Sequence, residues 1–143
     1  MKNKLLVLIS GVILSAVVTG YLVLPVKPEP KNYDLVIVKV KDEWKVVDAS
    51  DHSKTGVKVK RKDTIVWVAQ GTDAYMQFPD KLFDAVDPGD SLKNGYTKFL
   101  KDGKKLKLRI KDDAPAGTYE YAVFCTADGV FATGDSPPKI IIE

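Results

Sequence analysis

The sequence predicts an all-β domain, an antiparallel sandwich or barrel over residues 33–143, behind an N-terminal membrane segment. Residues 5–24 are apolar and carry no charge. From residue 33 onward, apolar residues recur at every second position, and turn-forming residues separate these runs. Beyond residue 24 we expect at most a short turn of helix, near residues 81–87. Several short strands without helices between them are typical of a sandwich or barrel.

The N-terminal segment is predicted to anchor the chain in a membrane through residues 5–24. Twenty residues at about 1.5 Å each span roughly 30 Å, the thickness of the hydrocarbon core of a bilayer. Lys2 and Lys4 precede the segment and favour a cytoplasmic N-terminus, which places the domain in the periplasm or otherwise outside the cytoplasm. The alternative is a signal peptide cleaved after Gly20, which would release a secreted form.

Three regions follow from this pattern: a transmembrane segment at residues 1–24, a Pro-rich spacer at 25–32 and the β domain at 33–143. Apolar residues alternate with lysines in the runs that we expect to be half-buried strands. We expect the apolar residues to face the core and the lysines to face water. The core-facing residues predicted in this way are Val36, Val38, Val40, Val57, Val59, Leu106, Leu108 and Ile110. The apolar runs 65–68 and 140–142 predict more central strands.

Composition excludes several classes of site. The chain of 143 residues has one Cys and one His, so it has neither an intramolecular disulfide nor a site that needs two imidazoles. The formal net charge is +3, and two of the lysines precede the apolar segment. The remaining charge is too small to indicate a nucleic-acid partner.

The last third of the chain resembles the cupredoxins, the plastocyanin and azurin family of copper proteins. The resemblance rests on Gly117-Thr-Tyr-Glu-Tyr121, which leads to Cys125, and on the final run 139–143. Upstream, residues 62–67 and Phe78-Pro79 look like the segments that flank the first histidine ligand of the family. The resemblance implies a Greek-key β-sandwich with a copper site made of two His, one Cys and a weak axial ligand.

Most of these copper ligands are missing from the sequence. Cys125 matches the cysteine ligand, but Asp128 stands where plastocyanin-like members place the second histidine. Ala74, Tyr75 or Met76 falls at the first histidine, and His52 belongs to an earlier loop. The candidate ligands for an atypical metal site are therefore Cys125, Asp128, Met76 and His52. The favoured expectation is that no cofactor is bound, and copper is the alternative.

Each candidate ligand also has an ordinary structural interpretation. By strand alternation, Cys125 shares a face with Tyr121 and Val123, which predicts a buried and unreactive thiol. Ala127-Asp128-Gly129 is a common turn sequence. His52 lies between polar residues and is expected to be exposed.

We expect the function to be that of a membrane-anchored interaction module that is not an enzyme. Tyr75, Met76 and Phe131 are the candidate contacts for a protein of the cell envelope, and Phe78 lies close to them in sequence. The alternative is a copper-binding or electron-transfer protein that uses Cys125. A Cys–His nucleophile pair would need His52 within about 3 Å of Cys125, and nothing in the sequence indicates that they meet.

Overall fold

The structure is a computed structural model, and it describes residues 27–79, 81–133 and 137–143. It is built from β-strands, with one short 3-10 helix, η1, at Pro88–Asp90. The strands are β1 (Asn32–Val40), β2 (Glu43–Asp48), β3 (Val57–Val59), β4 (Thr64–Ala69), β5 (Ala74–Gln77), β6 (Phe83–Ala85), β7 (Thr97–Leu100), β8 (Lys105–Ile110), β9 (Gly117–Glu120), β10 (Ala122–Cys125), β11 (Val130–Phe131) and β12 (Lys139–Ile142).

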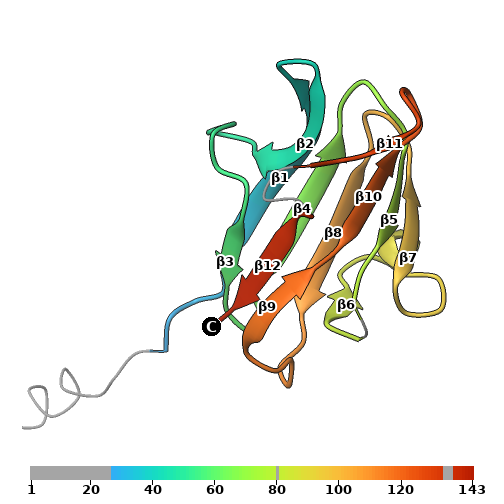
Figure 1. Ribbon diagram of the computed structural model, residues 1–143. Helices are drawn as coiled ribbons and strands as arrows, with labels where there is room; N and C mark the ends of the chain where they lie inside the picture. Colours follow the sequence, from blue (N-terminus) through green and yellow to red (C-terminus); the bar gives the residue numbers. More distant parts are fainter. Residues whose placement is uncertain (1–26, 80, 134–136) are drawn as a thin grey trace, which may run out of the picture.

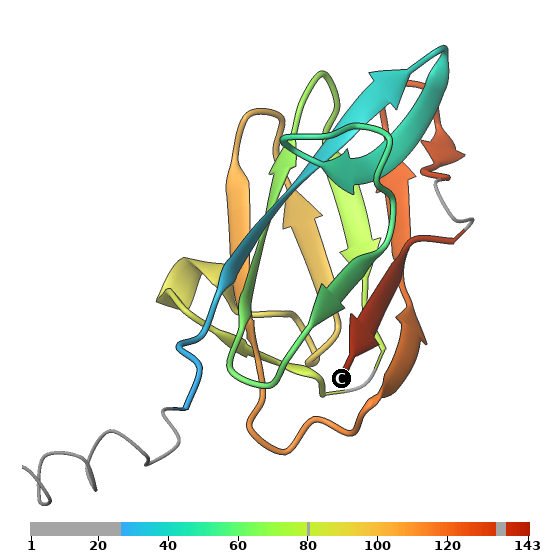
Figure 2. The same cartoon turned by 90° about the vertical axis from the view of Figure 1, so that its left-hand side faces the viewer.

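The strands form a sandwich of two layers (Figures 1 and 2). One layer is a five-stranded sheet in the order β2-β1-β4-β8-β6. The other layer contains a four-stranded sheet, β11-β10-β5-β7, and a three-stranded sheet, β3-β12-β9. At Tyr121 the chain passes from β9, which pairs with β12, to β10, which pairs with β5. The predicted all-β sandwich is therefore confirmed.

The sheets are mixed, and the expectation of purely antiparallel pairing is wrong. Strand β1 pairs with β4 in parallel, and β3 pairs with β12 in parallel. Parallel neighbours need a crossover between them. Here the chain leaves β1 through β2 and β3 before it returns as β4, so the two strands run in the same direction. Alternating residues predict a strand but do not give the direction of its neighbour.

The core-facing side of β1 is opposite to the one predicted. Leu35 and Ile37 belong to the main core, whereas Val38 and Val40 are only half-buried. Val36 is buried, but it lies on the outer face, where it pairs with Val47 of β2. The inner and outer faces of this strand are both apolar near its middle, so alternation with lysine identified the wrong one. The prediction for β3 and β8 is confirmed, because Val57, Val59 and the three apolar residues of β8 are buried.

The short helix expected near residues 81–87 is replaced by a strand. Phe83–Ala85 forms β6, which pairs with β8 at one edge of the five-stranded sheet. Leu82 and Phe83 are buried there, so tertiary packing determines the local conformation. The only helical residues among those described between 81 and 133 are the three of η1.

Within the described residues no helix is long and apolar enough to cross a membrane. The predicted membrane segment, residues 5–24, lies outside those residues. Residues 27–31, the described part of the spacer that precedes β1, are exposed and form no regular secondary structure.

An aromatic cluster packs in the core between the two layers. Trp67 of β4 packs against Phe78, Phe83 and Tyr121, with ring centroids 5.1, 6.0 and 5.9 Å away. The indole Nε1 of Trp67 donates a hydrogen bond of 3.2 Å to the hydroxyl of Tyr121. Phe78 is thus a core residue and is not part of an exposed end of the domain, because its ring stacks on Tyr121 at 5.4 Å.

Candidate functional site

Two of the candidate metal ligands, Cys125 and Asp128, lie at the upper end of the sandwich in Figure 1, where the chain turns from β10 into β11. The backbone of this turn is fixed by the loop between β4 and β5. The amide of Thr126 donates to the carbonyl oxygen of Asp73 at 3.1 Å, and the amide of Ala127 donates to Thr72 Oγ1 at 3.1 Å. Asp73 Oδ1 in turn accepts a hydrogen bond of 2.8 Å from the amide of Asp102.

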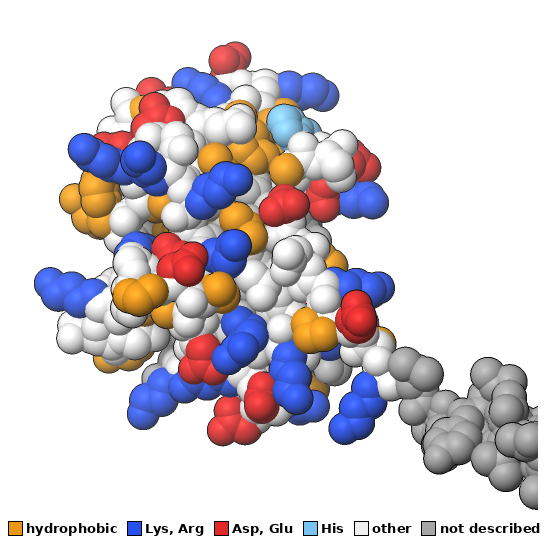
Figure 3. Space-filling model, turned by 180° about the vertical axis from the view of Figure 1, so that it is seen from behind, with side chains coloured by type: hydrophobic (Ala, Val, Ile, Leu, Met, Phe, Trp, Pro, Cys, Tyr) orange, Lys and Arg blue, Asp and Glu red, His pale blue; other side chains and the backbone are white. Residues whose placement is uncertain are grey.

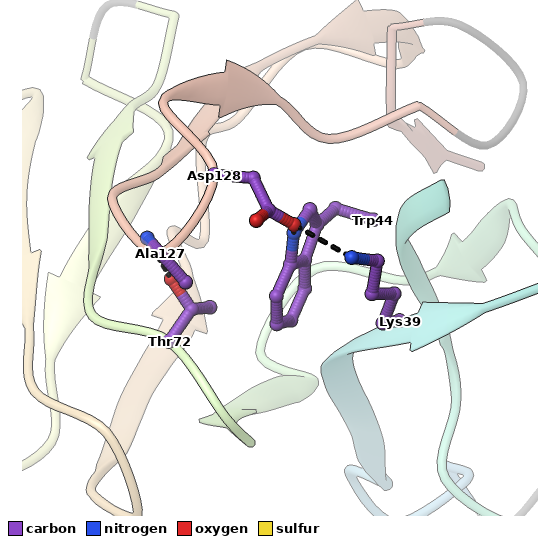
Figure 4. Close-up of polar contacts among 5 residues, drawn as sticks. All are labelled: Lys39, Trp44, Thr72, Ala127 and Asp128. Atoms are coloured by element: carbon purple, nitrogen blue, oxygen red, sulfur yellow. Dashed lines mark hydrogen bonds and ion pairs between the residues drawn. The ribbon is translucent and has the colours of Figure 1, made fainter. Parts of the chain in front are cut away.

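The carboxylate of Asp128 joins this turn to the hairpin of β1 and β2 (Figure 4). Its Oδ2 atom accepts hydrogen bonds from Lys39 Nζ at 2.8 Å and from Trp44 Nε1 at 2.6 Å. These two donors, Lys39 first, lower the pKa of Asp128 below its ordinary value. The carboxylate is therefore held ionised by groups of the protein itself, and both of these hydrogen bonds use its Oδ2 atom.

The Cys125 thiol is enclosed by apolar neighbours at the end of β10. Its partners across the sheet are Ala74 of β5 and Val130 of β11, and its side chain has no exposed surface. Burial, and to a smaller extent the negative charge of Asp128, raise the pKa of the Cys125 thiol to about 11. Because metal ligation requires the thiolate, this environment opposes it at neutral pH.

Met76 shares the inner face of the sheet with Cys125, whereas His52 lies in a different loop. Met76 lies on β5 opposite Val123, its side chain is 1% exposed, and it belongs to the main core. His52 is exposed in the loop between β2 and β3. This loop forms backbone hydrogen bonds within itself and one to the carbonyl oxygen of Asp34 in β1. Among the described residues, no group of three or more His, Cys, Asp or Glu side chains is arranged to hold a metal ion.

The residues present therefore do not fit a type 1 copper centre. Such a centre needs two imidazoles and a thiolate around one ion. Here the position near Cys125 offers a carboxylate that already accepts two hydrogen bonds, and the methionine packs in the core. The close partners of Asp128 are two donors, Lys39 and Trp44, which join the hairpin of β1 and β2 to the turn.

A second feature, the aromatic face, lies on the outer surface of the four-stranded sheet. It consists of four side chains at paired positions on neighbouring strands: Phe131 of β11, Phe124 of β10, Tyr75 of β5 and Phe99 of β7. Tyr75, Phe99 and Phe131 are 56%, 43% and 63% exposed, and Phe124 is half-buried. A row of large exposed aromatic side chains on one sheet face is typical of an interaction surface.

The four rings form two pairs with a groove beside them. Tyr75 packs on Phe99 with ring centroids 4.7 Å apart, and Phe124 packs on Phe131 at 5.2 Å. The groove has a volume of about 530 Å³ and also contacts Gln77, Thr97 and Ala122, which form the next row of the sheet. Lys93 is the cation beside the groove. Met76 and Lys98 also line it, but they are paired across β5 and β7 and their side chains lie on the opposite side of the sheet from Tyr75 and Phe99. Figure 3 shows hydrophobic side chains beside Lys and Arg side chains along the margin of the molecule where β7 lies.

The structure brings together two of the three partner-binding residues that the sequence predicts. Tyr75 and Phe131 both belong to the aromatic face, but Met76 points to the opposite side of β5 because side chains alternate along a strand. Phe99 and Phe124 were missed. Phe124 could have been found from the sequence, since a buried Cys125 and a buried Val123 require the residue between them to face outward.

Comparison with known proteins gives structural neighbours only. No family model matches the chain, and no curated protein matches it. Among solved structures, the chain is similar to a copper(I) form of an amicyanin variant in which Met is replaced by Gln. The sequence identity is 15%, the match covers 81% of this chain and 95% of that chain, and the TM-score is 0.42. A reduced amicyanin variant with Pro replaced by Phe gives 15% identity, coverage of 82% and 86%, and a TM-score of 0.39.

Proposed function

We propose that this chain is a cupredoxin-like interaction module without a type 1 copper site, and that it is not an enzyme. In this proposal, residues 5–24 hold it in a membrane with the β domain on the extracytoplasmic side, and the aromatic face contacts a protein of the cell envelope. The observation that supports this role is the exposure of Tyr75, Phe99 and Phe131 on one face of one sheet.

The aromatic face can supply part of the free energy that a specific contact needs. A buried aromatic side chain removes about 200 Å² from water. Three rings that are each about half exposed offer roughly 300 Å², or about 7 kcal/mol at about 25 cal/mol per Å². Association costs a comparable amount of translational and rotational freedom. A stable complex therefore needs further contacts, which the adjoining groove can supply.

The alternative function, a copper-binding or electron-transfer protein built on Cys125, finds less support. The buried thiol with its raised pKa and the hydrogen-bonded Asp128 carboxylate both disfavour a metal at this end of the domain. A nucleophile pair of Cys125 and His52 is disfavoured for a related reason. The thiol is enclosed at the end of β10, whereas His52 lies in an exposed loop on the far side of β2.

A photo-crosslinking amino acid placed at position 131 tests the proposed surface in the cell. The matched control places it at Lys58, an exposed residue of β3. We expect position 131 to give a discrete adduct with one envelope protein, which disappears when Tyr75→Ser and Phe99→Ser are combined. The same adduct from position 58, or its persistence in the double variant, would show that the aromatic face is not the contact surface.

A further inference from the structure

The arrangement of the aromatic face restricts the chemistry of its partner. The two ring pairs are each tilted, with interplanar angles of 44° for Tyr75 and Phe99 and 70° for Phe124 and Phe131. A flat ligand that stacks on several rings at once, such as the face of a sugar chain, needs rings that lie in one plane. The rings here present edges and a recess, which suit the insertion of a side chain.

The dimensions of the groove suit one large apolar side chain together with the extended chain that carries it. Its volume of about 530 Å³ lies within the range of about 300–1,000 Å³ that is typical of small-molecule sites. It contacts β5, β7 and β10 and reaches from the row of Tyr75 to the row of Gln77. The small side chain of Ala122 lies in this second row, opposite Gln77, and leaves room there. A short stretch of extended chain with one large apolar side chain fits this shape.

The charges at the groove have one sign. Lys93 provides the charge beside it, and no Asp or Glu lines it among the described residues. The ammonium of Lys98 lies on the other side of β7, where it donates a hydrogen bond to the carbonyl oxygen of Gly89 in η1. Glu120 lines a neighbouring hollow, which shares Gln77 and Ala122 with the groove, but Glu120 does not line the groove itself.

This charge argues against a second copy of the chain as the occupant. In a two-fold symmetric dimer each subunit uses the same patch, so Lys93 of one groove would be brought towards Lys93 of the other. Like charges placed together across an interface oppose association. A partner with carboxylates next to its apolar group is complementary instead.

We infer that the groove binds an extended acidic segment of a partner protein, in which one aromatic or leucine side chain enters between the ring pairs while a flanking Asp or Glu residue faces Lys93. This inference rests on the proposed function, since it specifies the partner of the same surface. The apolar insertion supplies most of the affinity, and the charge pairs supply orientation and a dependence on salt.

The test uses the full chain in phosphatidylcholine nanodiscs and three labelled peptides, with binding followed by fluorescence anisotropy. The first peptide is Glu-Asp-Gly-Trp-Leu-Glu-Asp, the second replaces Trp-Leu by Ser-Ser, and the third replaces every acidic residue by Lys. We expect the first to bind at least tenfold more tightly than the other two in about 50 mM salt. At about 500 mM salt its affinity should fall several-fold, because the Debye length shortens from roughly 14 Å to roughly 4 Å.

Protein variants separate the two components of the contact. Tyr75→Ser with Phe131→Ser removes exposed rings, and Lys93→Glu reverses one charge. Lys58→Glu, remote on β3, is the matched control. We expect the first two changes each to weaken the acidic aromatic peptide about tenfold or more and the control to leave it within twofold. Near-UV circular dichroism checks that each variant remains folded.

Three results would overturn the inference: equal binding of the acidic and lysine peptides, unchanged binding in Lys93→Glu, or binding to phosphatidylglycerol vesicles through Tyr75 and Phe131 with no peptide binding. Crosslinking from position 131 to an envelope protein that lacks an exposed acidic segment would preserve the proposed function while refuting this description of the partner. Failure of both the peptide and the crosslinking experiments would refute the two together.

Discussion

The Cys125 thiol offers the most quantitative prediction, because its reactivity follows directly from its surroundings. With a pKa of about 11, roughly one thiol in a thousand is ionised at pH 8. A free cysteine with a pKa near 8.5 is about one quarter ionised at the same pH. Because the thiolate is the nucleophile, ionisation alone should slow the reaction of the folded protein about 200-fold. Complete burial adds a further factor, since a reagent must reach the sulfur.

The assay is the release of thionitrobenzoate from a disulfide reagent, followed by absorbance at pH 8 in folded protein and in guanidinium. We expect one thiol to react rapidly in the unfolded chain and at least 200 times more slowly in the folded one. The folded rate should rise with pH up to about 11. A folded rate within tenfold of the unfolded rate would mean that Cys125 is accessible and ionised, as a metal ligand or a reactive thiol would be, and would refute the reasoning.

Three other predictions concern the fold and the Asp128 contact. Ile37→Ala should lower the free energy of unfolding in urea by about 2–5 kcal/mol, because Ile37 is fully buried; Val38→Ala on the opposite face should cost clearly less, and the reverse order would contradict the observed orientation of β1. Tyr121→Phe removes the acceptor of the buried Trp67 indole and should cost about 1–3 kcal/mol, whereas Tyr96→Phe at an exposed site should cost little; equal effects would exclude a role for this hydrogen bond. The pKa of Asp128 is lowered in the folded state, so its contribution to stability is present above its ordinary pKa near 3.8 and is lost as the pH falls through the lowered value. When the free energy of unfolding is measured against pH, Asp128→Asn should therefore lose less stability at acid pH than Asp113→Asn does. Equal losses at acid pH in the two variants would contradict this contact.

The sequence predicts those parts of the fold in which one face of a strand is polar. Lys105, Lys107 and Arg109 alternate with buried residues along β8, and the structure agrees with that alternation. Strand β1 differs because Leu35, Val36 and Ile37 are all buried, so periodicity cannot identify its inner face. The strand β6 has no alternating pattern of its own, and it forms because Phe83 finds a place in the core next to Trp67.

The candidate site, too, can be predicted only in part from the sequence. The burial of Cys125 follows from its spacing to Val123 and Tyr121, and the structure confirms it. The contact of Asp128 with Lys39 and Trp44 joins residues more than 80 positions apart, so local sequence does not indicate it. The aromatic face likewise depends on the register between β5, β7, β10 and β11, which single-strand patterns do not determine.

Copper titration of the full chain, read by visible absorption, tests the central claim most directly. Asp128 already accepts two hydrogen bonds and the thiol of Cys125 is buried and protonated, so we expect no stoichiometric uptake and no thiolate-to-copper charge-transfer band. The appearance of that band at one copper per chain, and its loss in Cys125→Ser, would contradict the account.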